Sequence, residues 1–144
     1  MAIGLFAHNQ KAYESALQML EDEHKTAVIH PTGTGKSFIG FQFVDEHPDW
    51  RICWISPSDY IFQTQLENIK KVKKDISLKD LCFLTYAKLM NMGMEEMNAL
   101  HPDLIILDEF HRAGAAEWAK GVQRLIELYP EAMLLGLSAT HIRY

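Results

Sequence analysis

The stretch His30-Pro31-Thr32-Gly33-Thr34-Gly35-Lys36-Ser37 decides the fold that the chain can adopt. The β-branched run from Thr26 to Ile29 precedes it and predicts a buried strand, and the apolar segment from Phe38 to Val44 predicts a helix after it. A phosphate-binding loop (P-loop) requires this order of strand, glycine-rich turn ending in Gly-Lys-Ser, and helix. Gly33 and Gly35 favour this interpretation, because a residue without a Cβ lets the backbone approach a phosphate closely.

The residues predicted to bind the nucleotide phosphates are Pro31, Thr32, Gly33, Thr34, Gly35, Lys36 and Ser37. Backbone N–H groups of such a loop point inward, and the positive end of the following helix adds to their attraction for an anion. Lys36 is expected to reach the β- and γ-phosphates, and the Ser37 hydroxyl to ligate Mg²⁺. His30 departs from the pattern G-x-x-x-x-G-K-[ST], which has its first glycine there; the alternative is a glycine-rich turn that happens to precede a lysine.

Length and composition narrow the class of protein. A chain of 144 residues, 48% of them apolar and 23% charged, predicts one globular domain with a single core. No apolar run is long enough to span a membrane and no secretion signal is visible, so we expect a cytoplasmic protein. Cys53 and Cys82 lie in apolar, strand-like runs, which favours buried reduced thiols over a disulfide or a metal site. The net charge of −5 implies that any surface tracking phosphates is local or lies outside this chain.

Apolar segments alternate with helical patterns along the whole chain. The predicted strands are Thr26–Ile29, Arg51–Ile55, Leu81–Thr85, Leu104–Leu107 and Ala132–Leu137. The predicted helices are Asn9–Glu23 with Asn9 as N-cap, the P-loop helix to about Glu46, Asp59–Lys73, Tyr86–Met90, Met94–Leu100 and Ala115–Tyr129. This alternation predicts a parallel sheet covered by helices on both faces, in which ligands gather at the carboxyl ends of the strands.

Asp108 and Glu109 follow the apolar run Leu104–Leu107, at the end of a predicted strand. An acid at this place can hold Mg²⁺ opposite Ser37. Glu109 is placed to orient or deprotonate a water that attacks the γ-phosphate. The alternative interpretation is an acidic pair that caps the next helix, because carboxylates stabilise helix N-termini.

Three motifs occur in a characteristic order: Pro-Thr-Gly-Thr-Gly-Lys-Ser, Asp-Glu-Phe-His as a variant DEAD/DEAH box, and Ser-Ala-Thr. Together they resemble the first motor domain of superfamily 2 helicases, and Leu-Ile-Ile-Leu-Asp-Glu-Phe-His-Arg-Ala is most similar to the motor subunits of type I and III restriction enzymes. The resemblance implies a RecA-like P-loop NTPase, a three-layer α/β/α sandwich with a mainly parallel sheet of five or more strands. It also implies Mg²⁺-ATP as fuel and nucleic acid, DNA rather than RNA, as partner. Residues 1–144 would be the first RecA-like domain, and a second one, absent from this chain, would supply the arginine finger for fast hydrolysis.

The resemblance also assigns roles to single residues. Gln10 would read the adenine edge, Ser56 and Pro57 would form motif Ia, Thr85 and Tyr86 motif Ib, Ser138 and Thr140 motif III, and His111 would link Glu109 to motif III. A solvated Gln10 and ordinary turns at the strand ends are the alternatives. The lysines at positions 70, 71, 73 and 74 either grip phosphates or form a solvated helix end.

Three functions remain to be distinguished. The leading hypothesis is an ATP-driven helicase or translocase, and the second is a P-loop NTPase that has no role with nucleic acid. A binding module with a degenerate motor site is the third, and the presence of Lys36, Ser37, Asp108 and Glu109 argues against it.

Overall fold

A computed structural model of the chain describes residues 7–29, 36–72, 78–108 and 116–138. Its elements in chain order are α1 (Ala7–Glu23), β1 (Lys25–Ile29), α2 (Lys36–Glu46), β2 (Ile52–Ser56), α3 (Asp59–Val72), β3 (Leu81–Thr85), α4 (Tyr86–Met90), α5 (Met94–Asn98), β4 (Leu104–Asp108), α6 (Ala116–Leu128) and β5 (Met133–Ser138). Every predicted strand and helix is present, with small shifts at the ends. The predicted N-cap at Asn9 is wrong, because α1 begins at Ala7 and places Asn9 inside the helix.

The five strands form one parallel sheet in the order β1-β5-β4-β2-β3. The chain moves from β1 to β2 and on to β3, and then returns through β4 to β5. Right-handed crossovers place the connecting helices on one face of the sheet during the outward movement and on the other face during the return. The order of the strands therefore explains why the helices cover both faces.

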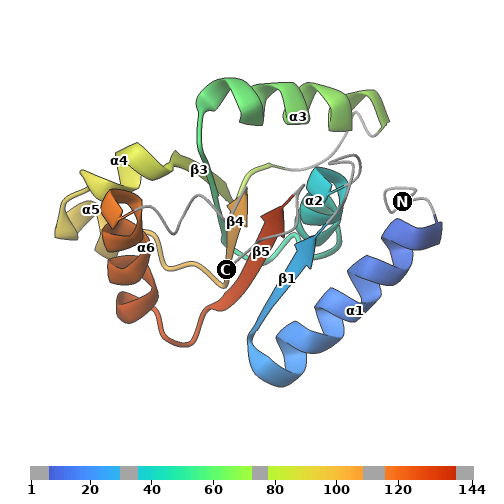
Figure 1. Ribbon diagram of the computed structural model, residues 1–144, viewed down its shortest axis with the longest axis horizontal. Helices are drawn as coiled ribbons and strands as arrows, with labels where there is room; N and C mark the ends of the chain where they lie inside the picture. Colours follow the sequence, from blue (N-terminus) through green and yellow to red (C-terminus); the bar gives the residue numbers. More distant parts are fainter. Residues whose placement is uncertain (1–6, 30–35, 73–77, 109–115, 139–144) are drawn as a thin grey trace.

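Two apolar clusters confirm the three layers. One cluster joins α1, α2 and α3 to the sheet residues Ile52, Trp54, Leu104, Ile106, Leu135 and Leu137. The other joins α4, α5 and α6 to the alternate sheet residues Ile55, Leu84, Ile105 and Leu107. Successive residues of a strand face opposite sides, so two-sided burial requires the nearly continuous apolar runs that the sequence contains. Figure 1 shows α4, α5 and α6 on one side of the sheet and α1 and α2 on the other.

Helix α2 lies very close to the sheet at Gly40. A Cβ at this position would stand 2.6 Å from Cη2 and 2.8 Å from Cζ3 of Trp54, and 3.2 Å from Cδ1 of Leu137. The Trp54 ring is fully buried between Phe41 and Phe62, with ring centroids 4.6 and 5.6 Å away. Gly40 thus seats α2 on β2 and β5 one helical turn after Lys36, the first residue of the helix.

On the other face, α6 holds α4 in place. Gly121 of α6 approaches the α4 backbone so closely that a Cβ would lie 3.0 Å from Met90 Cα. The Arg124 guanidinium donates hydrogen bonds to the carbonyl oxygens of Leu89, Met90 and Met92, at 3.3, 3.0 and 3.2 Å. These charge-assisted bonds satisfy carbonyl groups at the end of α4 and fix its position. Among the described helices, none is long and apolar enough to cross a membrane.

Candidate functional site

The carboxyl ends of the five strands are level with one another across the sheet. Ile29, the last residue of β1, pairs with Ser138 of β5, and Asp108 of β4 pairs with Leu137 of the same strand. On the other side of β4, Ile55 pairs with Leu107 and Ser56 pairs with Thr85. The polar motifs found in the sequence therefore begin at one edge of the molecule, as the sequence predicts.

Strand β1, which leads into the P-loop sequence, and strand β4, which ends at Asp108, flank β5. Two strand spacings separate them, about 10 Å. The chain leaves β1 toward α2 on one face and leaves β4 toward α6 on the other. Ligands of open α/β sheets bind outside the carboxyl ends of the strands, so this edge of the sheet is the candidate site.

Asp108 is a fully buried carboxylate at this edge. Every second residue of a strand faces the same side of the sheet, so Asp108 faces the same side as Leu104 and Ile106. The side chains of Leu104 and Ile106 pack with α1, α2 and α3. The Asp108 side chain therefore points to the face of the sheet that α2 covers. Its strand neighbour Leu137 lies under Gly40 of α2. The carboxylate thus lies on the side of the sheet where α2 begins with Lys36 and Ser37.

These residue types fit a magnesium ion. Mg²⁺ prefers hard oxygen ligands and takes only one or two from the protein when phosphates supply others. Asp108 is a carboxylate residue of β4 and Ser37 a hydroxyl residue at the start of α2, and both elements contribute to the same face of the sheet.

Tyr86 makes a contact with the site that sequence reasoning missed. Its side chain is fully buried, and its hydroxyl donates a 2.9 Å hydrogen bond to the carbonyl oxygen of Asp108. The bond crosses from the first residue of α4 to the last residue of β4, and α6 holds α4 through Arg124. Tyr86 therefore positions the end of β4, at the point where the chain continues to Glu109.

The residues expected to touch nucleic acid differ in exposure. Ser56 is fully buried, and its hydroxyl donates to the carbonyl oxygen of Ser58 at 3.4 Å. Thr85 is half-buried and caps α4, since its hydroxyl accepts a hydrogen bond from Lys88 N–H at 3.0 Å. Of the residues predicted to touch nucleic acid at this end of β2 and β3, Pro57 and Thr85 are partly exposed, whereas the side chains of Ser56 and Tyr86 are buried.

Several predicted site residues lie outside the described residues: Pro31, Thr32, Gly33, Thr34, Gly35, Glu109, His111 and Thr140. Four others are placed by their backbone. Gln10 lies in the first turn of α1, Lys36 and Ser37 open α2, and Ser138 ends β5. Helix α1 contacts α2 and β1, so it belongs to the same side of the molecule as the start of α2.

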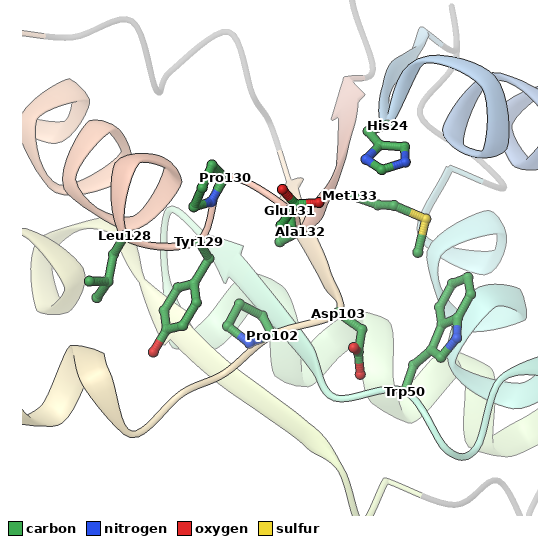
Figure 2. Close-up of a pocket in the computed structure, with 10 residues that line it drawn as sticks. All are labelled: His24, Trp50, Pro102, Asp103, Leu128, Tyr129, Pro130, Glu131, Ala132 and Met133. Carbon is green, nitrogen blue, oxygen red and sulfur yellow. The ribbon is translucent and has the colours of Figure 1, made fainter.

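A cleft of about 400 Å³ lies at the opposite edge of the sheet. Figure 2 shows the residues around it, among them His24, Trp50, Asp103, Tyr129 and Met133, which come from the segments before the strands or from their amino ends. Asp103 uses a carboxylate oxygen to accept the Arg51 backbone N–H at 2.9 Å. This cleft is separated from Asp108 by the length of the strands and is not the site formed at the carboxyl edge.

One solved structure supports the fold, a P-loop ATPase domain with a parallel sheet between helices. The ATPase domain of the large terminase from Thermus phage P74-26 matches with a TM-score of 0.51 and 13% identity, over 83% of this chain and 61% of that chain. Domain III of the replication initiation protein DnaA from Thermotoga maritima matches with a TM-score of 0.49 and 16% identity, over 95% of this chain and 53% of that chain. The chain thus spans roughly half to three fifths of the length of these solved chains. A search among curated proteins gave no match.

The sequence as a whole matches a protein-family model. Residues 2–143 fit the model described as type III restriction enzyme, res subunit. The match covers nearly the entire chain and includes all the motifs on which the resemblance to superfamily 2 motor domains was based, so that resemblance is confirmed. The chain belongs to the family of type III restriction enzyme res subunits, as a helicase-like ATPase domain.

Proposed function

We propose that this domain binds Mg²⁺-ATP at the carboxyl edge of its sheet and couples ATP hydrolysis to movement along nucleic acid, preferably DNA. The observation that carries the proposal is the buried carboxylate of Asp108, on the α2 side of the sheet, with only β5 between its strand and the strand that leads into the P-loop sequence. Membership of the res subunit family supports the same assignment.

Each proposed role follows from the chemistry of the residue. Lys36 attracts the β- and γ-phosphates, and the loop residues before it surround them with N–H donors. Ser37 and Asp108 would hold Mg²⁺, which when bound neutralises charge on the phosphates. Glu109 orients or deprotonates the attacking water. Gln10 offers both a donor and an acceptor to the adenine edge.

We propose a second RecA-like domain as the partner that completes the site. In nucleotide hydrolases of this chemistry, an arginine finger stabilises the charge of the transition state and increases the rate by orders of magnitude. On this proposal the present chain binds nucleotide by itself and hydrolyses it slowly. Turnover of several ATP molecules per second by this chain alone would contradict the proposal.

A P-loop NTPase without a nucleic-acid role is the second candidate. Two observations favour it: the net charge of −5, and the burial of the Ser56 and Tyr86 side chains. The two candidates differ in one measurable property. DNA or RNA stimulates ATP hydrolysis by the intact protein if it is a nucleic-acid motor, and leaves the rate unchanged if it is not.

The experiment that tests nucleotide binding is a titration with fluorescent ATP and ADP in Mg²⁺, with GTP as competitor. We expect adenine-selective binding that disappears in Lys36→Ala. Lys120→Ala is a matched control, because Lys120 is an exposed lysine on α6. Binding without base preference would remove the role given to Gln10, and equal affinity of Lys36→Ala and wild type would contradict the P-loop assignment.

A further inference from the structure

The two cysteines of the chain form a pair on neighbouring strands. Cys53 of β2 is the register partner of Cys82 of β3, and both are free thiols. Cys53 is two residues from Ile55 on β2, and Cys82 is two residues from Leu84 on β3, so each cysteine faces the same side of the sheet as that residue. Both cysteines therefore point to the face that α4, α5 and α6 cover. The two thiols are close enough to interact, and this interaction raises the pKa of Cys53 and lowers that of Cys82.

The two thiols differ in access to solvent. Cys53 is 2% exposed, whereas Cys82 is half-buried and lies on β3, which stands at one end of the described sheet. A cavity of about 150 Å³ opens onto the pair, and its charged lining residues are Arg51, Lys79 and Asp80. Cysteines that serve only as small apolar core residues need no such opening. A small polar molecule can therefore reach Cys82 first.

Charge around the pair favours a thiolate on Cys82. The interaction with Cys53 lowers the pKa of Cys82, and the positive charges of Lys88 and Arg51 lower it further against the opposing effect of burial. The same interaction and burial raise the pKa of Cys53. Since the thiolate is the nucleophile, Cys82, the less buried member of the pair, is also the reactive one. The Arg51 guanidinium is held nearby by donating to the Ala99 carbonyl at 3.3 Å.

We propose that Cys53 and Cys82 form a reversible redox-modification site, in which a hydroperoxide oxidises Cys82 and Cys53 then closes a disulfide between β2 and β3. This site lies on the opposite face of the sheet from the Asp108 side chain, and the proposal does not depend on the proposed ATPase function.

The chemistry balances in two steps. The Cys82 thiolate attacks one peroxide oxygen, the O–O bond breaks, and the leaving oxygen takes a proton, so that Cys82 becomes a sulfenic acid. The Cys53 sulfur then attacks the Cys82 sulfur, the S–O bond breaks, and hydroxide leaves with the Cys53 proton as water. Two thiols have lost two electrons in total, and hydrogen peroxide has been reduced to two waters.

The geometry allows a disulfide that is easily reduced. Register partners on parallel strands have Cα atoms about 4.8 Å apart, within the usual disulfide range of about 4.4–6.8 Å. Their Cβ atoms are separated by a similar distance, while a relaxed disulfide prefers about 3.8 Å, so the strands must approach slightly. The strain raises the reduction potential of the bond, as in disulfides that form and break reversibly.

The test is oxidation of the intact, reduced chain with hydrogen peroxide, followed by alkylation and non-reducing peptide mapping. We expect an intramolecular Cys53–Cys82 peptide that disappears on treatment with dithiothreitol. In Cys53→Ser, a sulfenic acid at Cys82 should accumulate and react with dimedone. In Cys82→Ser, oxidation of Cys53 should be slower by about tenfold or more, because the remaining thiol has little thiolate.

A measurement on wild type avoids dependence on the variants. Timed alkylation of the folded chain should label Cys82 before Cys53, and the difference should vanish in urea. Equal labelling rates in the folded chain, earlier labelling of Cys53, or oxidation that yields only intermolecular disulfides would each overturn the proposal.

Discussion

Replacement of Gly40 by alanine tests how α2 is seated on the sheet. The new Cβ would stand 2.6 and 2.8 Å from two atoms of Trp54, where ordinary contacts lie at 3.4–4 Å. Trp54 is fully buried and packs against Phe41 and Phe62, so its ring has no free space into which it can move. Either α2 shifts away from the sheet or the aromatic cluster is distorted.

Two opposing effects set the magnitude. Alanine stabilises a helix interior by about 1 kcal/mol relative to glycine. Overpacking of a filled core costs about 1–3 kcal/mol, and contacts below 3 Å with a fixed ring place Gly40→Ala at the upper end of that range. The net expectation is a loss of about 2 kcal/mol in the free energy of unfolding, which corresponds to a Tm lower by roughly 4–8 °C.

Urea unfolding measures this loss of stability in four variants: Gly40→Ala, Gly93→Ala, Trp54→Phe, and Gly40→Ala combined with Trp54→Phe. Gly93→Ala is the matched control, because a Cβ there would meet nothing within 4 Å, and its stability should stay within about 0.5 kcal/mol of wild type. Trp54→Phe removes the two ring atoms that the new Cβ would meet, so Gly40→Ala should no longer destabilise in that background. The reasoning is refuted if Gly40→Ala is as stable as wild type, or if it costs the same with and without Trp54.

Three further predictions concern single side chains. Tyr86→Phe removes the hydrogen bond to the Asp108 carbonyl and should cost about 0.5–1.5 kcal/mol in urea unfolding and lower the rate of ATP hydrolysis; an unchanged rate would exclude the positioning role. His24→Gly should stabilise the chain by up to about 1 kcal/mol in the same assay, because His24 has a φ of 63° after α1; a loss of stability would contradict this. Burial and Glu46 raise the pKa of the Tyr13 hydroxyl above its ordinary value of 10.0. The neutral hydroxyl therefore contributes fully to the free energy of unfolding below pH 10, and this contribution is lost as the pH rises from 10 through the raised pKa. In thermal unfolding at alkaline pH, the Tm of Tyr13→Phe should therefore decrease less steeply with rising pH than the Tm of wild type.

Local sequence patterns were sufficient for the elements of the fold. Residues 104–107 of β4 form an uninterrupted apolar run between Asp103 and Asp108, and such runs are typical of strands buried on both faces. Asn9 was misassigned as a cap because Ala7 and His8 carry no helical pattern of their own, yet α1 includes them. The order of the strands was not predictable from any local pattern, since it depends on which connections cross the sheet in which direction.

The site was predictable where chemistry is local and not where it depends on a distant partner. Asp108 follows a strand and was found from its neighbours in the sequence. Tyr86 was predicted only as part of motif Ib or of an ordinary turn at a strand end, and its bond to Asp108 joins segments that only the tertiary structure brings together. The pairing of Cys53 with Cys82 likewise required knowledge that β2 and β3 are neighbours in register.

The position of β1 has a consequence for the order in which the chain folds. In the described sheet, the strand that leads into the P-loop sequence is hydrogen-bonded to β5 alone, so Lys25, near the start of the chain, pairs with Leu134, near its end. Closing so long a loop costs entropy that local contacts cannot repay, and pairings of this kind form late. During synthesis on a ribosome, β1 must wait for β5 to emerge. Until then, the strand that leads into the P-loop sequence has no partner in the described sheet.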